Sequence, residues 1–280
     1  MILRLLTLIK FSHSLFALPF ALSSMLLASG GWPRGWVGLW IVLCMIFART
    51  AAMAFNRWAD WHLDQANPRT ANRAKLATRR QLAVLFSVSV VLFIACAAAI
   101  NLLCFVLSPL AVMIFCVYSL MKRFSSASHL VLGLALSCAP IGAWIAVEGH
   151  AWDPLPWLIG ATVIFWVAGF DIIYATQDIE SDRALKLHSI PARFGWQRSL
   201  WIARVLHLMA WLIGLLVGLN GDFHEAYYGI WTAVGIVLIA QHYWAQNRTP
   251  ASIQRAFFYC NIIISHLFLA ATILEVWILS

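Results

Sequence analysis

The sequence predicts an all-α integral membrane protein with nine transmembrane helices around a central cavity, and three observations support that class. The chain of 280 residues is 62% hydrophobic and has a mean hydropathy of +0.83, far above that of soluble globular proteins. Its apolar residues gather in runs of roughly 20, the length that spans a bilayer as a helix. Its lysines and arginines alternate between successive connections, as the positive-inside rule describes.

Each predicted helix corresponds to an apolar run that falls within the roughly 17–25 residues needed for one crossing. The run over 81–121 is too long for one helix, so we divide it near Asn101, which places Pro109 close to the start of the second half. The predicted spans lie near 11–29, 36–56, 81–101, 103–121, 128–147, 156–175, 198–219, 226–245 and 257–278. We find no linker or soluble segment and expect one polytopic domain over 1–280.

Nearly all of the basic residues lie on one side of the predicted bundle. The connections after the first, third, fifth and seventh spans contain only Arg34, and Arg4 and Lys10 precede the first span. The basic residues of the opposite connections are Arg57, Arg69, Arg73, Lys75, Arg79, Arg80, Lys122, Arg123, Arg183, Lys186, Arg193, Arg198, Arg248 and Arg255. This alternation predicts a cytoplasmic N-terminus and an external C-terminus. It also accounts for the net charge of +8 without a nucleic-acid partner.

A first polar segment, NRWADWHLDQANPRTANR over 56–73, follows the second predicted span. Asn56, Asp60 and Asp64 are spaced as NxxxDxxxD in it. On a continuous helix this spacing places the three side chains on one face. The segment would begin at the cytoplasmic end of its helix.

A second polar segment, over 171–195, follows the sixth predicted span and begins DIIYATQDIESD. Asp178 and Asp182 repeat the four-residue spacing, and Asp171 lies two turns before Asp178. The second segment is predicted on the same membrane side as the first. The two together resemble a weak internal repeat.

Two opposed carboxylate faces repel each other unless a cation lies between them. Sites rich in carboxylate oxygen suit Mg²⁺, which keeps several waters and is commonly shared with a substrate phosphate. The pattern therefore favours a magnesium-bridged diphosphate. An ion-coupled membrane transporter is the alternative, because ionisable groups in membrane helices also mark ion pathways. The acidic residues lie at the helix ends rather than near the bilayer midplane, which favours an enzyme that binds a diphosphate over a transporter.

Over nearly its whole length the chain resembles the UbiA-type intramembrane aromatic prenyltransferases. Three motifs in order carry the resemblance. NxxxDxxxD begins at Asn56, YxxxK is matched by Tyr118 and Lys122, and DxxYAxxDxxxD runs from Asp171 to Asp182 with Tyr174 inside it.

The resemblance implies a reaction in ubiquinone or menaquinone biosynthesis at the bacterial inner membrane. A polyprenyl diphosphate would bind through Mg²⁺ to both aspartate motifs, and its allylic C–O bond would ionise. The ring of an aromatic acid would then attack the carbocation. Metal ions would neutralise the charge that develops on the leaving diphosphate, and the bilayer would hold the isoprenoid tail.

The same resemblance assigns roles to individual residues. The implied metal ligands are Asn56, Asp60, Asp64, Asp178 and Asp182, and the four aspartates among them would be the catalytic carboxylates. The diphosphate and substrate contacts that we expect, from the resemblance and the nearby positive charge, are Asn56, Arg57, Arg73, Tyr118, Lys122, Arg123, Asp171, Tyr174 and His188. Arg123 is the candidate partner for the acceptor's carboxylate, because a guanidinium binds carboxylate in a bidentate manner. Asp171 would position the aromatic ring or support the second motif.

Two stretches bear on the identity of the acceptor. LKLHSIPARFG carries His188 where the benzoate-prenylating pattern often has lysine, and KFSHSLFALPFA carries Ser12 and His13. Both resemble the branch of the family linked to menaquinone made by the futalosine route. They favour 1,4-dihydroxy-6-naphthoate over 4-hydroxybenzoate as the acceptor, without deciding the prenyl chain length.

Overall fold

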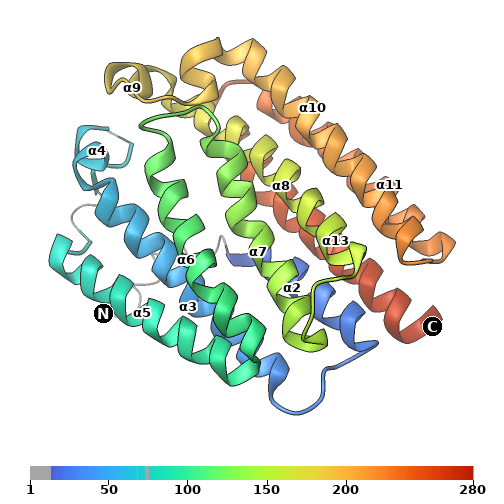
Figure 1. The fold of residues 1–280 in the computed structure, drawn as a ribbon. Helices are drawn as coiled ribbons and strands as arrows, with labels where there is room; N and C mark the ends of the chain where they lie inside the picture. Colours follow the sequence, from blue (N-terminus) through green and yellow to red (C-terminus); the bar gives the residue numbers. More distant parts are fainter. Residues whose placement is uncertain (1–13, 68, 73–75, 280) are drawn as a thin grey trace.

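A computed structural model of the chain describes residues 14–67, 69–72 and 76–279 (Figure 1). Within these residues the regular structure is helical and no strand occurs. The elements are α2 (Ser14–Ser29), α3 (Val37–Ala59), α4 (Trp61–Ala66), α5 (Arg79–Ile100), α6 (Leu102–Met121), α7 (Ser128–Glu148), α8 (Pro154–Ala175), η3 (Thr176–Asp178), α9 (Ile179–Ala184), α10 (Ile190–Asn220), α11 (Glu225–Ala245), α12 (Pro250–Gln254), η4 (Arg255–Tyr259), α13 (Cys260–Leu274) and η5 (Glu275–Leu279).

A helix lies at each predicted span among the described residues. Seven of them are long and apolar enough to cross a membrane, namely α3, α5, α6, α7, α8, α10 and the C-terminal helix that contains α13. The described part of α2 is shorter. The helix α11 is long but carries Glu225 in its first turn and Gln241 and His242 near its end, which lowers its hydropathy. The all-helical membrane class is confirmed, while nine crossings remain a prediction.

The division of the long apolar run near Asn101 is confirmed, and the structure gives its cause. Asn101 adopts an extended conformation, with φ of −162° and ψ of 166°, between α5 and α6. Its side-chain oxygen accepts the backbone N–H of Cys104 at 2.8 Å, which caps α6. Its amide also donates to the carbonyl of Ile145 at 2.9 Å, so the cap is tied to α7.

The packed centre of the bundle lies around α8, which contacts α7 and α10 along its length. Aromatic rings fill this region. Trp166 lies 5.1 Å from the ring centroid of Phe20 and 5.1 Å from that of Phe170. Phe20 stacks in turn on Phe268 at 4.8 Å. Among lipids, association of helices depends on such close packing and on hydrogen bonds, because the surrounding acyl chains are as apolar as the side chains.

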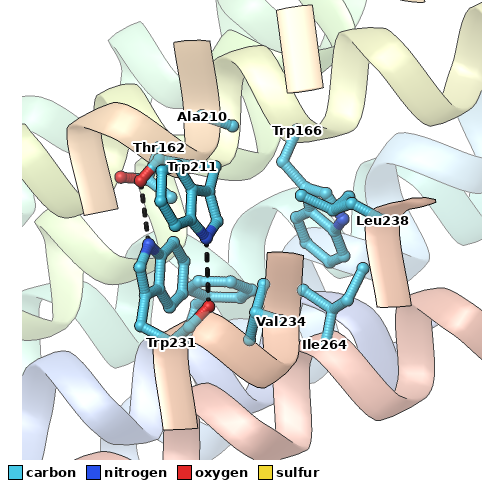
Figure 2. A pocket seen from close by; sticks show the side chains of 9 residues that line it. Thr162, Trp166, Ala210, Trp211, Trp231, Val234, Leu238 and Ile264 are labelled. Atoms are coloured by element: carbon cyan, nitrogen blue, oxygen red, sulfur yellow. Dashed lines mark hydrogen bonds between the residues drawn. The ribbon is translucent and has the colours of Figure 1, made fainter. Parts of the chain in front are cut away.

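Two tryptophans join α10 to α11 (Figure 2). The indole N–H of Trp211 donates to the carbonyl of Trp231 at 3.1 Å, and that of Trp231 donates to the carbonyl of Trp211 at 2.8 Å. Gly214 permits this approach, since a Cβ there would lie 1.9 Å from the Trp231 ring. The neighbouring cavity measures about 10 Å³, the lower limit for one water molecule, so this region is a packed interface.

Candidate functional site

The two polar segments lie at the same end of the bundle. The first leaves α3 and forms α4, and the second leaves α8 through η3 and forms α9. Figure 1 shows α4 and α9 at this common end, which also holds the α6–α7 connection. We call it the motif end.

The first aspartate motif is buried and paired with basic side chains. Asp60 is 3% exposed and accepts a hydrogen bond from Nζ of Lys122 at 2.6 Å. A guanidinium nitrogen of Arg123 lies 3.5 Å from the other Asp60 oxygen. Asp64 is 8% exposed and pairs with Nη1 of Arg57 at 3.1 Å. Arg57 is itself 7% exposed, so this ion pair is shielded from solvent on both sides.

The predicted continuous helical face over the first motif is interrupted. The helix α3 ends at Ala59, and Asp60 has φ of −89° and ψ of 12° before α4 begins at Trp61. The four-residue relation survives the break, because Asp64 N–H donates to the Asp60 carbonyl at 2.7 Å. Asn56 reaches across it, and its Nδ2 donates to Asp60 at 3.4 Å. The side chains of Asn56 and Asp60 therefore stay in contact, and Asp64 follows one turn later, although two helices carry the three residues.

The second aspartate motif is held by the tail of the first. Nε of Arg69 donates to Asp178 at 2.8 Å, and a second guanidinium nitrogen bonds the other carboxylate oxygen. Arg69 also donates to the hydroxyl of Tyr174 at 2.8 Å and lies over that ring. The amide of Asn67 donates to Asp178 at 3.1 Å. Residues more than 100 positions apart thus meet, and the two motifs form one polar region.

The α6–α7 connection provides a second link between the motifs. Lys122 holds Asp60 through its ammonium group, and its backbone carbonyl accepts the N–H of His188 at 2.7 Å. The side chain of His188 is exposed. Tyr118 is half-buried one turn before Lys122, where the charges of Asp60 and Asp171 act on its hydroxyl group. Residues of the first and the second aspartate segments therefore lie around the end of α6.

Asp171 is fixed by a residue to which sequence analysis gave no role. Nδ1 of His129 lies 2.7 Å from Asp171, and the backbone N–H of Ile190 donates to Nε2 of the same ring at 3.3 Å. Because Nε2 accepts, a neutral ring carries its proton on Nδ1 and donates it to Asp171. His129 is 3% exposed. No spacing motif connects positions 129 and 171, so only the fold reveals the pair.

Asp182 lies in α9, at the end of the second aspartate motif. Burial raises the pKa of its carboxyl group above the ordinary value, and the negative charge of Asp178 acts in the same direction. A hydrogen bond from Ser189 and the positive charge of Lys122 oppose that rise without cancelling it. A nearby cation would stabilise the ionised form of a carboxyl group in these surroundings.

The oxygen donors of the site match the chemistry of a magnesium ion. Among the described residues, no three histidine, cysteine or acidic side chains lie close enough together to hold one metal ion. Mg²⁺ does not require such a cage, because it commonly binds one or two carboxylates and completes its octahedron with waters and phosphate oxygens. The basic partners of Asp60, Asp64 and Asp178 show that positive charge is already favourable there. The residues therefore fit the ion.

Three residues that sequence analysis singles out have no description in the structure. Arg73, Ser12 and His13 lie outside the described residues. Conversely, Asn67 and Arg69 connect the first segment directly to Asp178 of the second motif. Arg69 was noted only as one of several nearby cations. The positions of both, directly after NxxxDxxxD, are the signal that could have found them.

Comparison with known proteins places the chain among prenyl-transferring enzymes. The sequence profile described as the UbiA prenyltransferase family matches residues 17–263. A 4-hydroxybenzoate octaprenyltransferase of Aeromonas hydrophila is 30% identical over 241 residues, covering 85% of this chain and 83% of that protein. The protein of the same name from Aeromonas salmonicida is 32% identical over 233 residues, covering 81% and 80%.

Solved structures agree with the sequence relatives. The apo structure of a UbiA homologue from Aeropyrum pernix K1 matches with a TM-score of 0.85 and 28% identity, over 94% of this chain and 98% of that one. A UbiA homologue from Archaeoglobus fulgidus, solved with DMAPP and Mg²⁺, shares the fold with a TM-score of 0.74 and 20% identity, over 98% and 99%. With its helical membrane fold and two joined aspartate motifs, the chain belongs to the UbiA prenyltransferase family.

Proposed function

We propose that this enzyme transfers a polyprenyl group from a polyprenyl diphosphate to the ring of an aromatic acid, in a Mg²⁺-dependent reaction of quinone biosynthesis. The observation that carries the proposal is the contact of Asn67 and Arg69 with Asp178, which unites two carboxylate motifs into one polar site. A single diphosphate can then engage both motifs. The names of the bacterial relatives support the reaction class.

Magnesium would be held by the oxygen atoms of Asn56, Asp60, Asp64, Asp178 and Asp182. When bound, Mg²⁺ supplies the positive charge that neutralises the departing diphosphate. The carboxylates keep that charge at the motif end, where both aspartate motifs face one region. Their burial lowers the local dielectric, which strengthens every interaction with the diphosphate.

The basic side chains of the site would bind the diphosphate directly. Lys122, Arg57 and Arg69 now neutralise carboxylates, and each has donors that can turn to phosphate oxygen when a cation takes its place. Arg123 lies at the edge of this group and would bind the acceptor's carboxylate. Tyr118 would lie beside the diphosphate.

Asp171 would orient the acceptor ring. The proton on His129 keeps one Asp171 oxygen occupied, so the other stays available to a ring hydroxyl. The relatives are named for 4-hydroxybenzoate, whereas His188 and the N-terminal stretch favour 1,4-dihydroxy-6-naphthoate. We propose the naphthoate as the preferred acceptor, with hydroxybenzoate as the alternative to be measured beside it.

The arrangement in the membrane is part of the proposal. We propose one polytopic domain of nine crossings in the bacterial inner membrane, around a cavity that opens at the motif end. The basic connections at that end support a cytoplasmic location for it, with the N-terminus inside and the C-terminus outside. The prenyl tail would lie among the apolar helices or in the surrounding lipid.

The proposal is tested by removing one carboxylate from each motif. In vesicles with Mg²⁺, a polyprenyl diphosphate and either acceptor, Asp60→Asn and Asp178→Asn should each lower the rate of diphosphate release by a factor on the order of 10³. The matched control is Asp222→Asn, at an exposed turn where φ is 51°, a conformation that asparagine readily adopts. Full activity of Asp178→Asn would refute the assignment of the second motif.

A further inference from the structure

A basic cleft lies outside the candidate active site, between the first turns of α10 and the end of α11. It encloses about 500 Å³ and is lined by Arg198, Arg204 and Arg248 together with Trp196 and Trp201. No acidic residue lines it. In the part of the chain that the structure describes, none of the three arginines forms an ion pair, whereas arginines of the aspartate motifs do. The cleft therefore concentrates uncompensated positive charge.

Tryptophan rings position two of the guanidinium groups. Arg204 lies over the Trp201 ring at 5.0 Å, and Arg248 lies over the Trp196 ring at 5.1 Å. Trp201 is one turn nearer the helix start than Arg204, so the arginine side chain turns towards the motif end of the bundle. An arginine that extends its charge from an apolar helix towards the membrane surface, beside an exposed tryptophan, is typical of the bilayer interface.

Apolar, lipid-facing side chains lead away from the cleft along α10. Trp201 is 64% exposed, and the next residues on the same face, Val205, Leu208 and Leu212, are 53%, 56% and 48% exposed. Their spacing of three or four residues makes a continuous stripe along the helix. Because this stripe starts at the arginines, a molecule with a charged head and apolar chains would match both features.

The helix α11 supplies a second stripe beside the first. Ile236, Ile239 and Tyr243 are 63%, 72% and 68% exposed and lie on one face. Figure 1 shows α10 and α11 side by side along one edge of the bundle, away from α3 and α5. Two apolar stripes that converge on one basic cleft fit a lipid with more than one acyl chain better than they fit a free anion.

We propose that this cleft binds the phosphate headgroup of an anionic phospholipid of the bilayer, with its acyl chains along α10 and α11. The three arginines supply charge-assisted hydrogen bonds to phosphate oxygens. Basic pockets between membrane helices at the headgroup level are suited to such lipids. The site is separate from the aspartate motifs and does not depend on the proposed reaction.

The test compares spin-labelled phosphatidylglycerol with spin-labelled phosphatidylcholine on the full chain in phosphatidylcholine vesicles. The wild-type protein should show a preference for phosphatidylglycerol in the motionally restricted spectrum. Arg198→Gln/Arg248→Gln should lower that preference about threefold or more, towards equality. Arg198→Lys/Arg248→Lys keeps the charge and should retain part of the preference.

The matched control is Arg79→Gln/Arg80→Gln, which removes the same charge from exposed positions at the start of α5. Arg79 also lies over a tryptophan, Trp58, at 4.7 Å. The control should keep the wild-type preference. An equal loss in both double variants, or no loss in either, would overturn the proposal. The midpoint of thermal unfolding, measured for each variant, should stay near the wild-type value because these side chains are exposed.

A second arm separates a lipid from a free phosphate. Inorganic phosphate and sodium chloride, at equal ionic strength, should displace spin-labelled phosphatidylglycerol to the same small extent, because acyl chains contribute to its binding. Displacement by phosphate alone would instead assign the cleft to a soluble anion and would refute the lipid assignment.

Discussion

The two aspartate motifs of this protein are held in different ways. Asp60 and Asp64 have side chains that are 4% and 11% exposed, and their basic partners come from α3 and the adjoining end of α6. Asp178 is 15% exposed, and its partner Arg69 is 31% exposed and comes from the connection after the other motif. The first motif is built into packed helices. The second is completed only when a loop from the first half of the chain lies against it.

This difference predicts that breaking a pair in the first motif costs more stability than breaking the pair in the second. A buried ion pair that loses one partner leaves an uncompensated charge, at a cost of about 3–5 kcal/mol. A partly exposed pair contributes about 0–1 kcal/mol, since water replaces the lost partner. In the absence of a bound cation, the Arg57–Asp64 pair should therefore resist change, while the contact between Arg69 and Asp178 can open for a diphosphate at small cost.

The largest expected effect follows removal of Mg²⁺. Prenyl transfer should fall by a factor on the order of 10³ or more in excess chelator, because the carboxylates of both motifs then face a diphosphate without a cation between them. Measurement of product formation against free Mg²⁺ tests this. Restored activity on adding Mg²⁺ excludes unfolding as the cause, and unchanged activity in chelator would contradict the proposed role of the aspartates.

The next largest effect tests whether the first aspartate motif is held more firmly than the second. Arg57→Met should lower the free energy of unfolding by about 3–5 kcal/mol in chelator, because the buried Asp64 carboxylate would lose the guanidinium group of Arg57. Unfolding in detergent, followed by circular dichroism, provides the measurement.

The matched variant is Arg69→Met, which breaks the pair with Asp178. Its expected loss is about 0–1 kcal/mol, together with a raised Michaelis constant for the prenyl diphosphate. Equal losses of stability in the two variants would show that both motifs are held alike, contrary to the comparison.

A smaller effect than that of Arg57→Met concerns the His129–Asp171 pair. His129→Asn can still donate from its side-chain amide to Asp171, whereas His129→Gln places its amide where Nε2 meets the Ile190 N–H. We expect His129→Gln to lower kcat/KM for the aromatic acceptor about tenfold, with a smaller loss for His129→Asn. The Michaelis constant for the prenyl diphosphate should stay unchanged in both. A parallel change in both Michaelis constants would indicate a general structural role.

Sequence reasoning located the two motifs at one end of the bundle. The signal was local, because the length of an apolar run fixes where a helix ends and the count of runs fixes on which side it ends. The same reasoning missed the helix break at Asp60. A repeat of four residues is compatible with a continuous helix and with two short helices joined by one residue, and packing decides between them.

The sequence alone could not identify the partners of the aspartates. Asn67 meets Asp178 across 111 positions, and His129 meets Asp171 across 42. Neither pair has a spacing that a helix or strand imposes. Contacts of this kind depend on which helices pack side by side, as α7 does with α8.

By itself, the sequence determined the membrane class, most helix boundaries to within a few residues, and the two acidic segments near one surface. The starts of α10 at Ile190 and of the last helix at Pro250 lie seven or eight residues before the predicted 198 and 257. These follow from hydropathy and residue spacing, which act within one helix or one connection. Only the tertiary structure decided which cation neutralises which carboxylate, and that the tail of the first motif completes the second. The physical reason is that ion pairs form between groups that packing brings within a few ångströms, whatever their separation along the chain.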